Sequence, residues 1–351
     1  MKNGIEKNST YYMYLDVLRI IACFLVIVNH TDSRVFLRTS PSETWFLGLT
    51  YFFICKAAVP LFLMISGVLL LRKIDSYKNI GKKILRFTIV LIVFSLLYYV
   101  DGCLTSNSPI SIVSFFTSIY HNPATNALWY MYLYLAILIM LPILQKLANS
   151  MKKRDYQYYF FFSFIILGGM PIIVHYIPSA AYSDHFQLFI FSCYIGLLLL
   201  GFYIQNYLII NLKKCFIAIA IYIVGIAISV VLTYKEYLSS PKNYLFFDDR
   251  TLITVIAPSA CLFIVVKYLF DKVHFGEKGK RIIKEIGGCT FGTYLFSDFF
   301  IHKLKAVGIE DSLFQTVNPF LAAVIMEIIV FSAGMAISFL FRRIPFIKKL
   351  L

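Results

Sequence analysis

Long apolar runs, separated by short polar segments, follow one another from one end of the sequence to the other. Ten runs have about the 20 residues that an α-helix needs to cross the hydrocarbon core of a bilayer. They lie near residues 13–32, 46–71, 84–103, 127–145, 157–176, 187–206, 214–234, 251–270, 286–304 and 318–341. Gly168, Gly169 and Pro171 interrupt the fifth run, and Asp298 and His302 interrupt the ninth. The pattern predicts an all-α, polytopic membrane protein with about ten transmembrane helices.

Composition also favours a membrane protein. Of the 351 residues, 60% are hydrophobic and 15% are charged, whereas about 25% are charged in a typical soluble domain. No linker or low-complexity tract divides the chain, so residues 1–351 are interpreted as one membrane domain. The first run carries Arg19 and lacks the small-residue cleavage site of a signal peptide.

Cysteines occur singly in or beside the apolar runs. This spacing is typical of small core residues and predicts neither a disulfide framework nor a metal site. The seven cysteines are Cys23, Cys55, Cys103, Cys193, Cys215, Cys261 and Cys289.

Positive charge gathers on alternate polar segments. A net charge of +15 would suit a nucleic-acid partner, but its distribution predicts a membrane topology instead. With ten spans and a cytoplasmic N-terminus, 24 of the 33 Lys and Arg residues fall on the cytoplasmic side, as the positive-inside rule describes. We therefore expect both termini in the cytoplasm, a cell (inner or plasma) membrane as the location and no nucleic-acid partner. The basic residues outside are Arg34, Arg38, Lys235, Lys242, Arg250, Lys303 and Lys305.

The first run contains ionisable residues, which are costly inside a membrane and mark functional sites. Arg19 and His30 are eleven positions apart, which is about three helical turns, so their side chains share one face about 16 Å apart along the axis. Asp16 precedes Arg19 by three positions and is placed to pair with it. Asp32 follows just beyond. The alternative interpretation is structural: Asp16 and Arg19 form an ion pair that anchors the helix end, and His30 is a hydrogen-bonded histidine at the membrane interface.

The second run, YFFICKAAVPLFLMISGVLLL, places Lys56 in the outer half of the membrane and Ser66-Gly67 in the inner half. Pro60 lacks a backbone donor and should bend the helix, and Gly67 permits close approach of a neighbour or a ligand. The alternatives are structural: the Lys56 side chain can extend so that its ammonium reaches the outer membrane interface, and Ser66-Gly67 can serve helix packing alone.

Two of these segments together resemble a known family. LDVLRIIACFLVIVNH and VPLFLMISG are similar to the opening of the membrane acyltransferase-3 family, bacterial integral-membrane O-acyltransferases that modify cell-surface sugars. The family has an Arg and a His separated by ten residues, which Arg19 and His30 match. Its second span has a basic residue, then V-P-L-F and Ser-Gly, matched here by Lys56 and by Ser66 and Gly67.

Later segments extend the resemblance over essentially the whole chain. LWYMYLYLAILIMLPIL resembles the family's Leu-Trp-Tyr span, with Trp129 and Tyr130 at its outer end. FGTYLFSDF, which contains Tyr294, is similar to its late Phe-Gly-x-Tyr-Leu-x-His segment. Ser297 stands where many members have histidine, which puts the role of that histidine in doubt here.

The resemblance implies an O-acyltransferase, most simply an O-acetyltransferase. It would move an acyl group from cytosolic acyl-CoA, with acetyl-CoA the simplest donor, to a hydroxyl of a cell-surface or lipid-linked glycan. Arg19 stays protonated, so it is assigned to donor binding or to carbonyl polarisation, with Asp16, Ser66 and Gly67 beside the donor. His30 titrates near neutral pH and is assigned as the general base. A covalent acyl-histidine or acyl-serine relay remains an alternative.

Further embedded polar and aromatic residues are assigned to substrate binding. Glu327 is nearly central in the last run and is expected to be protonated or paired with a base such as Arg19 or Lys56. Asp298 and His302, at i,i+4, are placed to orient each other. The aromatic residues also suit an ordinary membrane-interface belt. The residues in this set are Asp32, Lys56, Trp129, Tyr130, Tyr294, Asp298, His302 and Glu327.

A transporter, a permease or a serine-sensing membrane domain of the same family type is the alternative function. Embedded charges mark transport pathways as well as catalytic centres, and the interrupted fifth run suits a discontinuous transporter helix. Against it, the two halves of the sequence show no internal repeat. The acceptor, the acyl group and the oligomeric state are not encoded in any motif.

Overall fold

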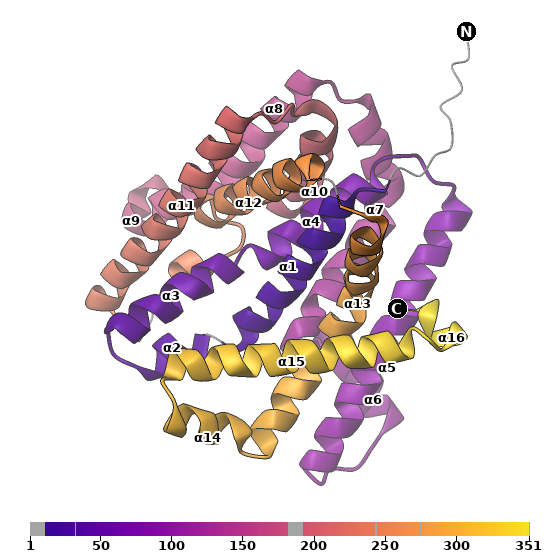
Figure 1. Ribbon diagram of the computed structural model, residues 1–351, viewed down its shortest axis with the longest axis vertical. Coiled ribbons are helices and arrows are strands. Elements are labelled where there is room, and N and C mark those ends of the chain that lie inside the picture. Colours follow the sequence, from indigo (N-terminus) through magenta and orange to yellow (C-terminus); the bar gives the residue numbers. More distant parts are fainter. Residues whose placement is uncertain (1–10, 32, 182–191, 243, 274, 351) are drawn as a thin grey trace.

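The computed structural model describes residues 11–31, 33–181, 192–242, 244–273 and 275–350. Within these ranges the regular structure is entirely helical, which confirms the all-α prediction (Figure 1). Each apolar run of the sequence corresponds to a helix or to two consecutive helices. These are α1 (Met13–Thr31), α3 (Glu43–Cys55) with α4 (Ala58–Leu70), α5 (Tyr77–Thr105), α7 (Trp129–Ser150), α8 (Lys153–Phe160) with α9 (Leu167–Tyr176), α10 (Cys193–Tyr207), α11 (Leu212–Ser239), α12 (Ile253–Lys272), α13 (Glu277–Ala306) and α15 (Pro319–Phe341).

Eight helical segments of the described chain are long and apolar enough to cross a membrane. The two remaining predicted spans are α10, whose described part has only 15 residues, and α13, which has 30 residues but mixes polar with apolar side chains. Short elements connect the long helices. They are α2 (Ser33–Arg38), α6 (Ile112–His121), α14 (Ile309–Thr316), α16 (Pro345–Lys348) and the 3₁₀ turns Asn126–Leu128, Pro178–Ala180 and Phe246–Asp248.

The second span is broken where Pro60 predicts a bend. An unbroken helix would bond the N–H of residue 60 to the carbonyl of Lys56, and proline has no N–H to donate. The helix α3 accordingly ends at Cys55, and α4 begins at Ala58. Lys56 therefore lies at a helix break, inside the bundle.

The fifth span differs from the interrupted helix that the sequence predicts. Residues Lys153–Tyr176 are helical throughout, with a π-helical segment, Phe161–Ile166, joining α8 to α9. Gly168 serves packing, because a Cβ atom there would lie 3.0 Å from the carbonyl oxygen of Thr251, just before α12. The helix therefore continues through Gly168, Gly169 and Pro171.

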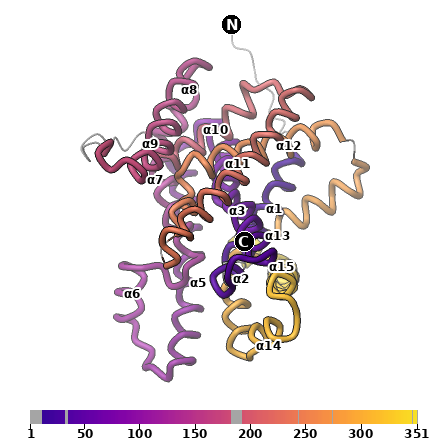
Figure 2. Tube along the Cα trace, turned by 90° about the vertical axis from the view of Figure 1, so that its left-hand side faces the viewer, coloured from indigo at the N-terminus to yellow at the C-terminus, as the bar shows by residue number. Residues whose placement is uncertain are grey.

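Helix α1 occupies the middle of the bundle, with α4, α12, α13 and α15 packed around it (Figure 1). Viewed from the side, α5 and α6 extend together away from the rest (Figure 2). The first turn of α1 and the end of the chain lie at the same end as the 72–86 segment. There the Arg72 guanidinium stacks on Tyr12, and Arg86 donates to the carbonyl of Leu350 at 3.0 Å.

Candidate functional site

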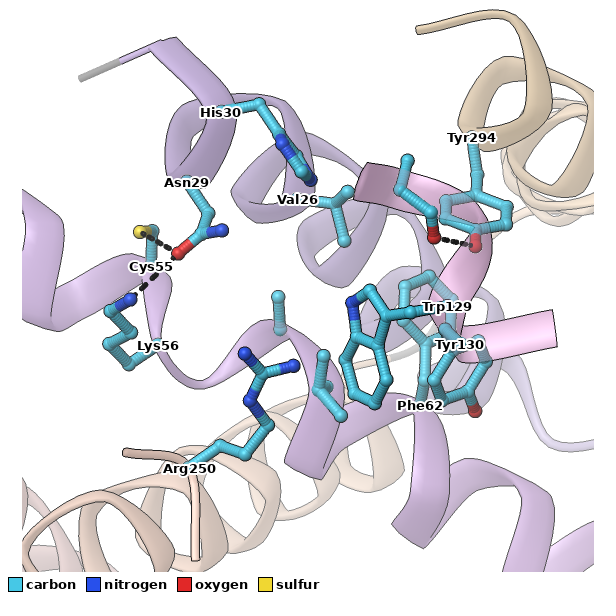
Figure 3. A pocket seen from close by; sticks show the side chains of 13 residues that line it. Val26, Asn29, His30, Cys55, Lys56, Phe62, Trp129, Tyr130, Arg250 and Tyr294 are labelled. Atoms are coloured by element: carbon cyan, nitrogen blue, oxygen red, sulfur yellow. Dashed lines mark hydrogen bonds between the residues drawn. The ribbon is translucent and has the colours of Figure 1, made fainter. Parts of the chain in front are cut away.

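Two cavities open along α1, one around each of its predicted functional residues. The first, called here the His30 cavity, is lined by residues of α1, α3, α4, α7 and α13 and of the segments before α7 and α12 (Figure 3). The second, the Arg19 cavity, has a volume of about 200 Å³ and is lined by α1, α4, α5, α7 and α13. Arg19 and His30 thus face separate cavities along one helix, as their spacing of about 16 Å requires.

Three aromatic side chains form the wall that the two cavities share, and we call them the aromatic partition. Phe62, Tyr130 and Tyr294 line both cavities, and they come from α4, α7 and α13. The ring centroids of Phe62 and Tyr130 are 6.0 Å apart, and those of Tyr130 and Tyr294 are 6.4 Å apart. The Tyr294 hydroxyl donates to the carbonyl of Ala127 at 2.5 Å. This wall is one side chain thick.

His30 faces its cavity with a carboxylate behind it. The imidazole points toward the middle of the cavity (Figure 3), and its Nδ1 lies 3.8 Å from Oδ1 of the buried Asp298. The other carboxylate oxygen, Oδ2, accepts from the Thr125 hydroxyl and, at 3.0 Å, from the Ala127 amide. These two donors aim the free oxygen of Asp298 at the imidazole. A contact of 3.8 Å is longer than a hydrogen bond, but catalytic hydrogen bonds are often long before substrate binds.

Lys56 enters the His30 cavity from the break between α3 and α4. Its ammonium donates to the Asn29 side chain at 3.0 Å and pairs with Asp248 Oδ2 at 3.2 Å. It also lies 3.8 Å from the centre of the Phe52 ring. The lysine is therefore held in the cavity wall by partners from three elements.

The Arg19 cavity has apolar walls and a cation at one end. Asp16 accepts from the Arg19 guanidinium at 2.6 Å, so the predicted ion pair is present, and the Arg19 side chain remains about one-third exposed. Ser66 also lines the cavity and donates to the carbonyl of Phe62 at 2.8 Å. Such a space accepts an apolar chain whose charged end is bound at Arg19.

One predicted residue, Glu327, has partners other than those expected. Glu327, fully buried, accepts from the Thr31 hydroxyl at 3.0 Å and from the Tyr51 hydroxyl at 2.9 Å. The predicted pairing of Glu327 with Arg19 or Lys56 is therefore wrong, since neutral hydroxyls already satisfy both carboxylate oxygens.

Three more predicted residues lie apart from the two cavities or outside the described chain. Gly67 packs against α10, where a Cβ atom would lie 1.8 Å from the carbonyl oxygen of Leu198. His302 lines a separate cleft between α5 and α13, so the carboxylate of Asp298 is oriented by contacts across the bundle. Asp32 lies outside the described residues.

Other side chains of the site carry no signal in the sequence. Arg250, which counted only as one basic residue of an outer segment, lines the His30 cavity beside Trp129 (Figure 3). Thr125 and Asn29 are common polar residues whose roles depend on contacts across the bundle. Among the described residues, no three His, Cys, Asp or Glu side chains gather as metal ligands would.

This fold defines a polytopic helical membrane protein whose central helix presents a guanidinium and a carboxylate-backed imidazole to two adjoining cavities. Over residues 12–343 the sequence matches a family described as an acyltransferase domain, and the chain belongs to this acyltransferase-3 family. It is a membrane acyltransferase. Comparison with curated proteins and with solved structures found no match.

Proposed function

We propose that the protein is an O-acyltransferase of the cell membrane that moves an acetyl group from cytosolic acetyl-CoA to a hydroxyl of a cell-surface or lipid-linked glycan. The observation that carries this proposal is the placement of Arg19 and His30 in two cavities that share only the aromatic partition. A charged donor and a hydroxyl acceptor can thereby approach the same point from opposite sides of the bilayer.

The donor is assigned to the Arg19 cavity. CoA carries phosphate groups, and a planar guanidinium binds phosphate or a carbonyl oxygen through two parallel N–H groups. Asp16 fixes one edge of the Arg19 guanidinium, which leaves its other N–H groups for the donor. The apolar walls suit the uncharged arm that ends in the thioester.

The acceptor is assigned to the His30 cavity. Asp298 favours the imidazole tautomer with its proton on Nδ1, so that Nε2 carries the lone pair on the cavity side. Nε2 takes the proton from the acceptor hydroxyl while the hydroxyl oxygen attacks the thioester carbonyl. The C–O bond forms, the C–S bond breaks, and the imidazolium returns its proton to the departing CoA thiolate. A general base so placed contributes about 10²–10⁴-fold in rate.

A transporter remains the rival, because two cavities separated by a thin gate also describe an alternating-access protein. The two functions differ in what the histidine does with its proton. A proton-coupled transporter uses such a histidine to relay protons along the transport path, whereas acyl transfer uses it to take the proton of the acceptor hydroxyl, so that only the enzyme forms an acetylated product.

The test uses purified protein in vesicles, with radiolabelled acetyl-CoA supplied on one side and glycan from the producing cells on the other. We expect labelled glycan with the wild type and at least a 100-fold loss with His30→Gln, since an amide cannot accept a proton at neutral pH. His121→Gln, on the exposed face of α6, is the matched control and should stay active. Glycan movement without acetylation, or an active His30→Gln protein, would contradict the proposal.

A further inference from the structure

The His30 cavity contains a second cation that the proposed reaction does not use. Arg250 lies between the 3₁₀ turn Phe246–Asp248 and α12, and its guanidinium carbon is 4.1 Å from the centre of the Trp129 ring. Both side chains line the cavity with His30 (Figure 3). Stacking on the indole fixes the plane of the guanidinium and leaves its N–H edges open to a ligand.

The acidic residues nearest Arg250 in the sequence have other partners. Asp248 pairs with Lys56, and Oδ1 of Asp249 accepts from the backbone N–H and the hydroxyl of Thr251, each at 2.8 Å. Asp298 lies behind the His30 ring, where Thr125 and Ala127 engage it. In the part of the chain that the structure describes, no carboxylate lies within 4.0 Å of the Arg250 guanidinium.

An unpaired guanidinium in a half-enclosed protein cavity is costly unless a ligand neutralises it. The cavity wall supplies Lys56 and Arg250 as cations, and Asp248 already pairs with the lysine. The donor's phosphates approach on the other side of the aromatic partition, at Arg19, so they do not meet Arg250. The group that Arg250 binds therefore belongs to the acceptor.

Building on the proposed function, we infer that the acceptor glycan is anionic and that Arg250, stacked on Trp129, binds its carboxylate or phosphate group while His30 deprotonates a nearby hydroxyl. A carboxylate and a phosphate both accept two parallel N–H groups of a guanidinium. The Trp129–Arg250 pair then selects the acceptor and fixes its position, and it takes no part in moving the proton.

The test compares acceptors that differ only in the group at C6, which is neutral in one sugar and anionic in the other two. Purified protein in nanodiscs receives acetyl-CoA with methyl glucoside, with methyl glucuronoside, in which a carboxylate replaces the C6 hydroxymethyl group, or with methyl glucoside 6-phosphate, in which the C6 hydroxyl carries a phosphate; the ring hydroxyls at C2, C3 and C4 are common to all three. We expect kcat/KM to be about 10–100-fold higher for at least one anionic sugar than for the neutral one, the range expected for a charge-assisted, two-point contact. The preferred anion distinguishes a uronic acid from a phosphorylated sugar.

Variants connect that preference to Arg250. Arg250→Gln should remove the advantage of the anionic sugar by raising its KM, so that its kcat/KM falls to about that of the neutral sugar in the same variant. Arg250→Lys should retain part of the preference, because the charge remains but the planar fork is lost. Lys242→Gln, an exposed basic residue of the same outer segment, is the matched control and should change neither value.

Binding measurements separate this inference from the proposed function. Calorimetry with the same sugars on His30→Ala protein should still show Arg250-dependent binding of the anionic sugar. Acetylation of neutral and anionic sugars at equal rates, unaffected by Arg250→Gln, would overturn the inference and leave the acyltransferase intact. Arg250-dependent binding without transfer to any sugar would support the anionic site and contradict the proposed reaction. Neither binding nor transfer would overturn both.

Discussion

Asp298→Asn tests whether the buried carboxylate holds His30 in the state that accepts a proton. The substitution preserves size and shape and changes only the hydrogen-bonding character of the two terminal atoms. Oδ2 of Asp298 accepts from Thr125 and Ala127, and Oδ1 faces His30 Nδ1 at 3.8 Å. The effect of the asparagine depends on which of its two ends turns toward the imidazole.

The two hydrogen-bond donors on the side of Asp298 away from His30 decide that orientation. The Thr125 hydroxyl and the Ala127 amide need an acceptor, so the amide oxygen of the asparagine must take the place of Oδ2. Its NH₂ group then faces Nδ1 of His30 and donates to it. An imidazole that accepts at Nδ1 carries its proton on Nε2, the nitrogen on the cavity side, and it no longer has a lone pair there for the acceptor hydroxyl.

The expected loss is therefore close to that of removing the base. A positioned base contributes about 10²–10⁴-fold, which equals about 2.7–5.4 kcal/mol of transition-state stabilisation. Stability should change far less, because both hydrogen bonds to the far oxygen persist and only their charge-assisted part is lost, about 1 kcal/mol. The melting temperature should fall by only about 1–2 °C, because the unfolding entropy of a chain of 351 residues is large.

Acetyl transfer, thermal unfolding and acetyl-CoA binding measured on one preparation check this reasoning. We expect kcat to fall and the affinity for acetyl-CoA to stay, since Arg19 lies in the other cavity. Asp101→Asn, which removes the carboxylate partner of Lys303 in the cleft between α5 and α13, is the matched control and should retain activity. Near-wild-type activity of Asp298→Asn, or a loss of activity that merely follows unfolding, would refute the role assigned to Asp298.

Three further predictions address donor binding, packing and topology. Arg19→Lys keeps the charge but loses the planar fork, so calorimetry should show acetyl-CoA binding weakened about 10-fold; unchanged affinity in Arg19→Ala would contradict the donor site. Gly67→Ala puts a Cβ atom 1.8 Å from a carbonyl oxygen of α10 and should lower the free energy of unfolding by about 1–3 kcal/mol or more, whereas Gly81→Ala, with open space around it, should raise it slightly in thermal melts. All seven native cysteines are buried, so an impermeant maleimide should label Ser108→Cys in intact cells and Ser150→Cys only after permeabilisation; the reverse pattern would contradict the topology.

Sequence periodicity anticipated the helices because each long apolar run must satisfy its own backbone groups inside a membrane. It also anticipated the relation of Arg19 to His30, since both lie on one helix and its geometry fixes their separation. Breaks were harder to foresee. The span breaks just before Pro60, where a bend was expected, whereas Pro171 lies inside α9, a helix that continues past it.

Contacts between helices could not be read from the sequence. Asp298 and His302 looked like partners because residues four apart in one helix lie side by side on the same face. In the structure α13 packs across α1, so Asp298 reaches His30 while His302 faces another cleft. The binding role inferred for Arg250 could not be predicted for the same reason, since it depends on a contact with Trp129, which is more than a hundred residues away in the chain.

One residue connects the wall between the two cavities to the orientation of the base. Ala127 donates its amide to Asp298 at 3.0 Å and accepts the Tyr294 hydroxyl on its carbonyl at 2.5 Å. In the proposed reaction, the thioester reaches the acceptor only if the aromatic partition opens. Displacing Tyr294 would pull on Ala127, the same residue that helps to aim the carboxylate at His30. Because the interior is densely packed, the two movements cannot be independent. In the proposed mechanism, opening the path for the donor and setting the position of His30 are therefore coupled through Ala127.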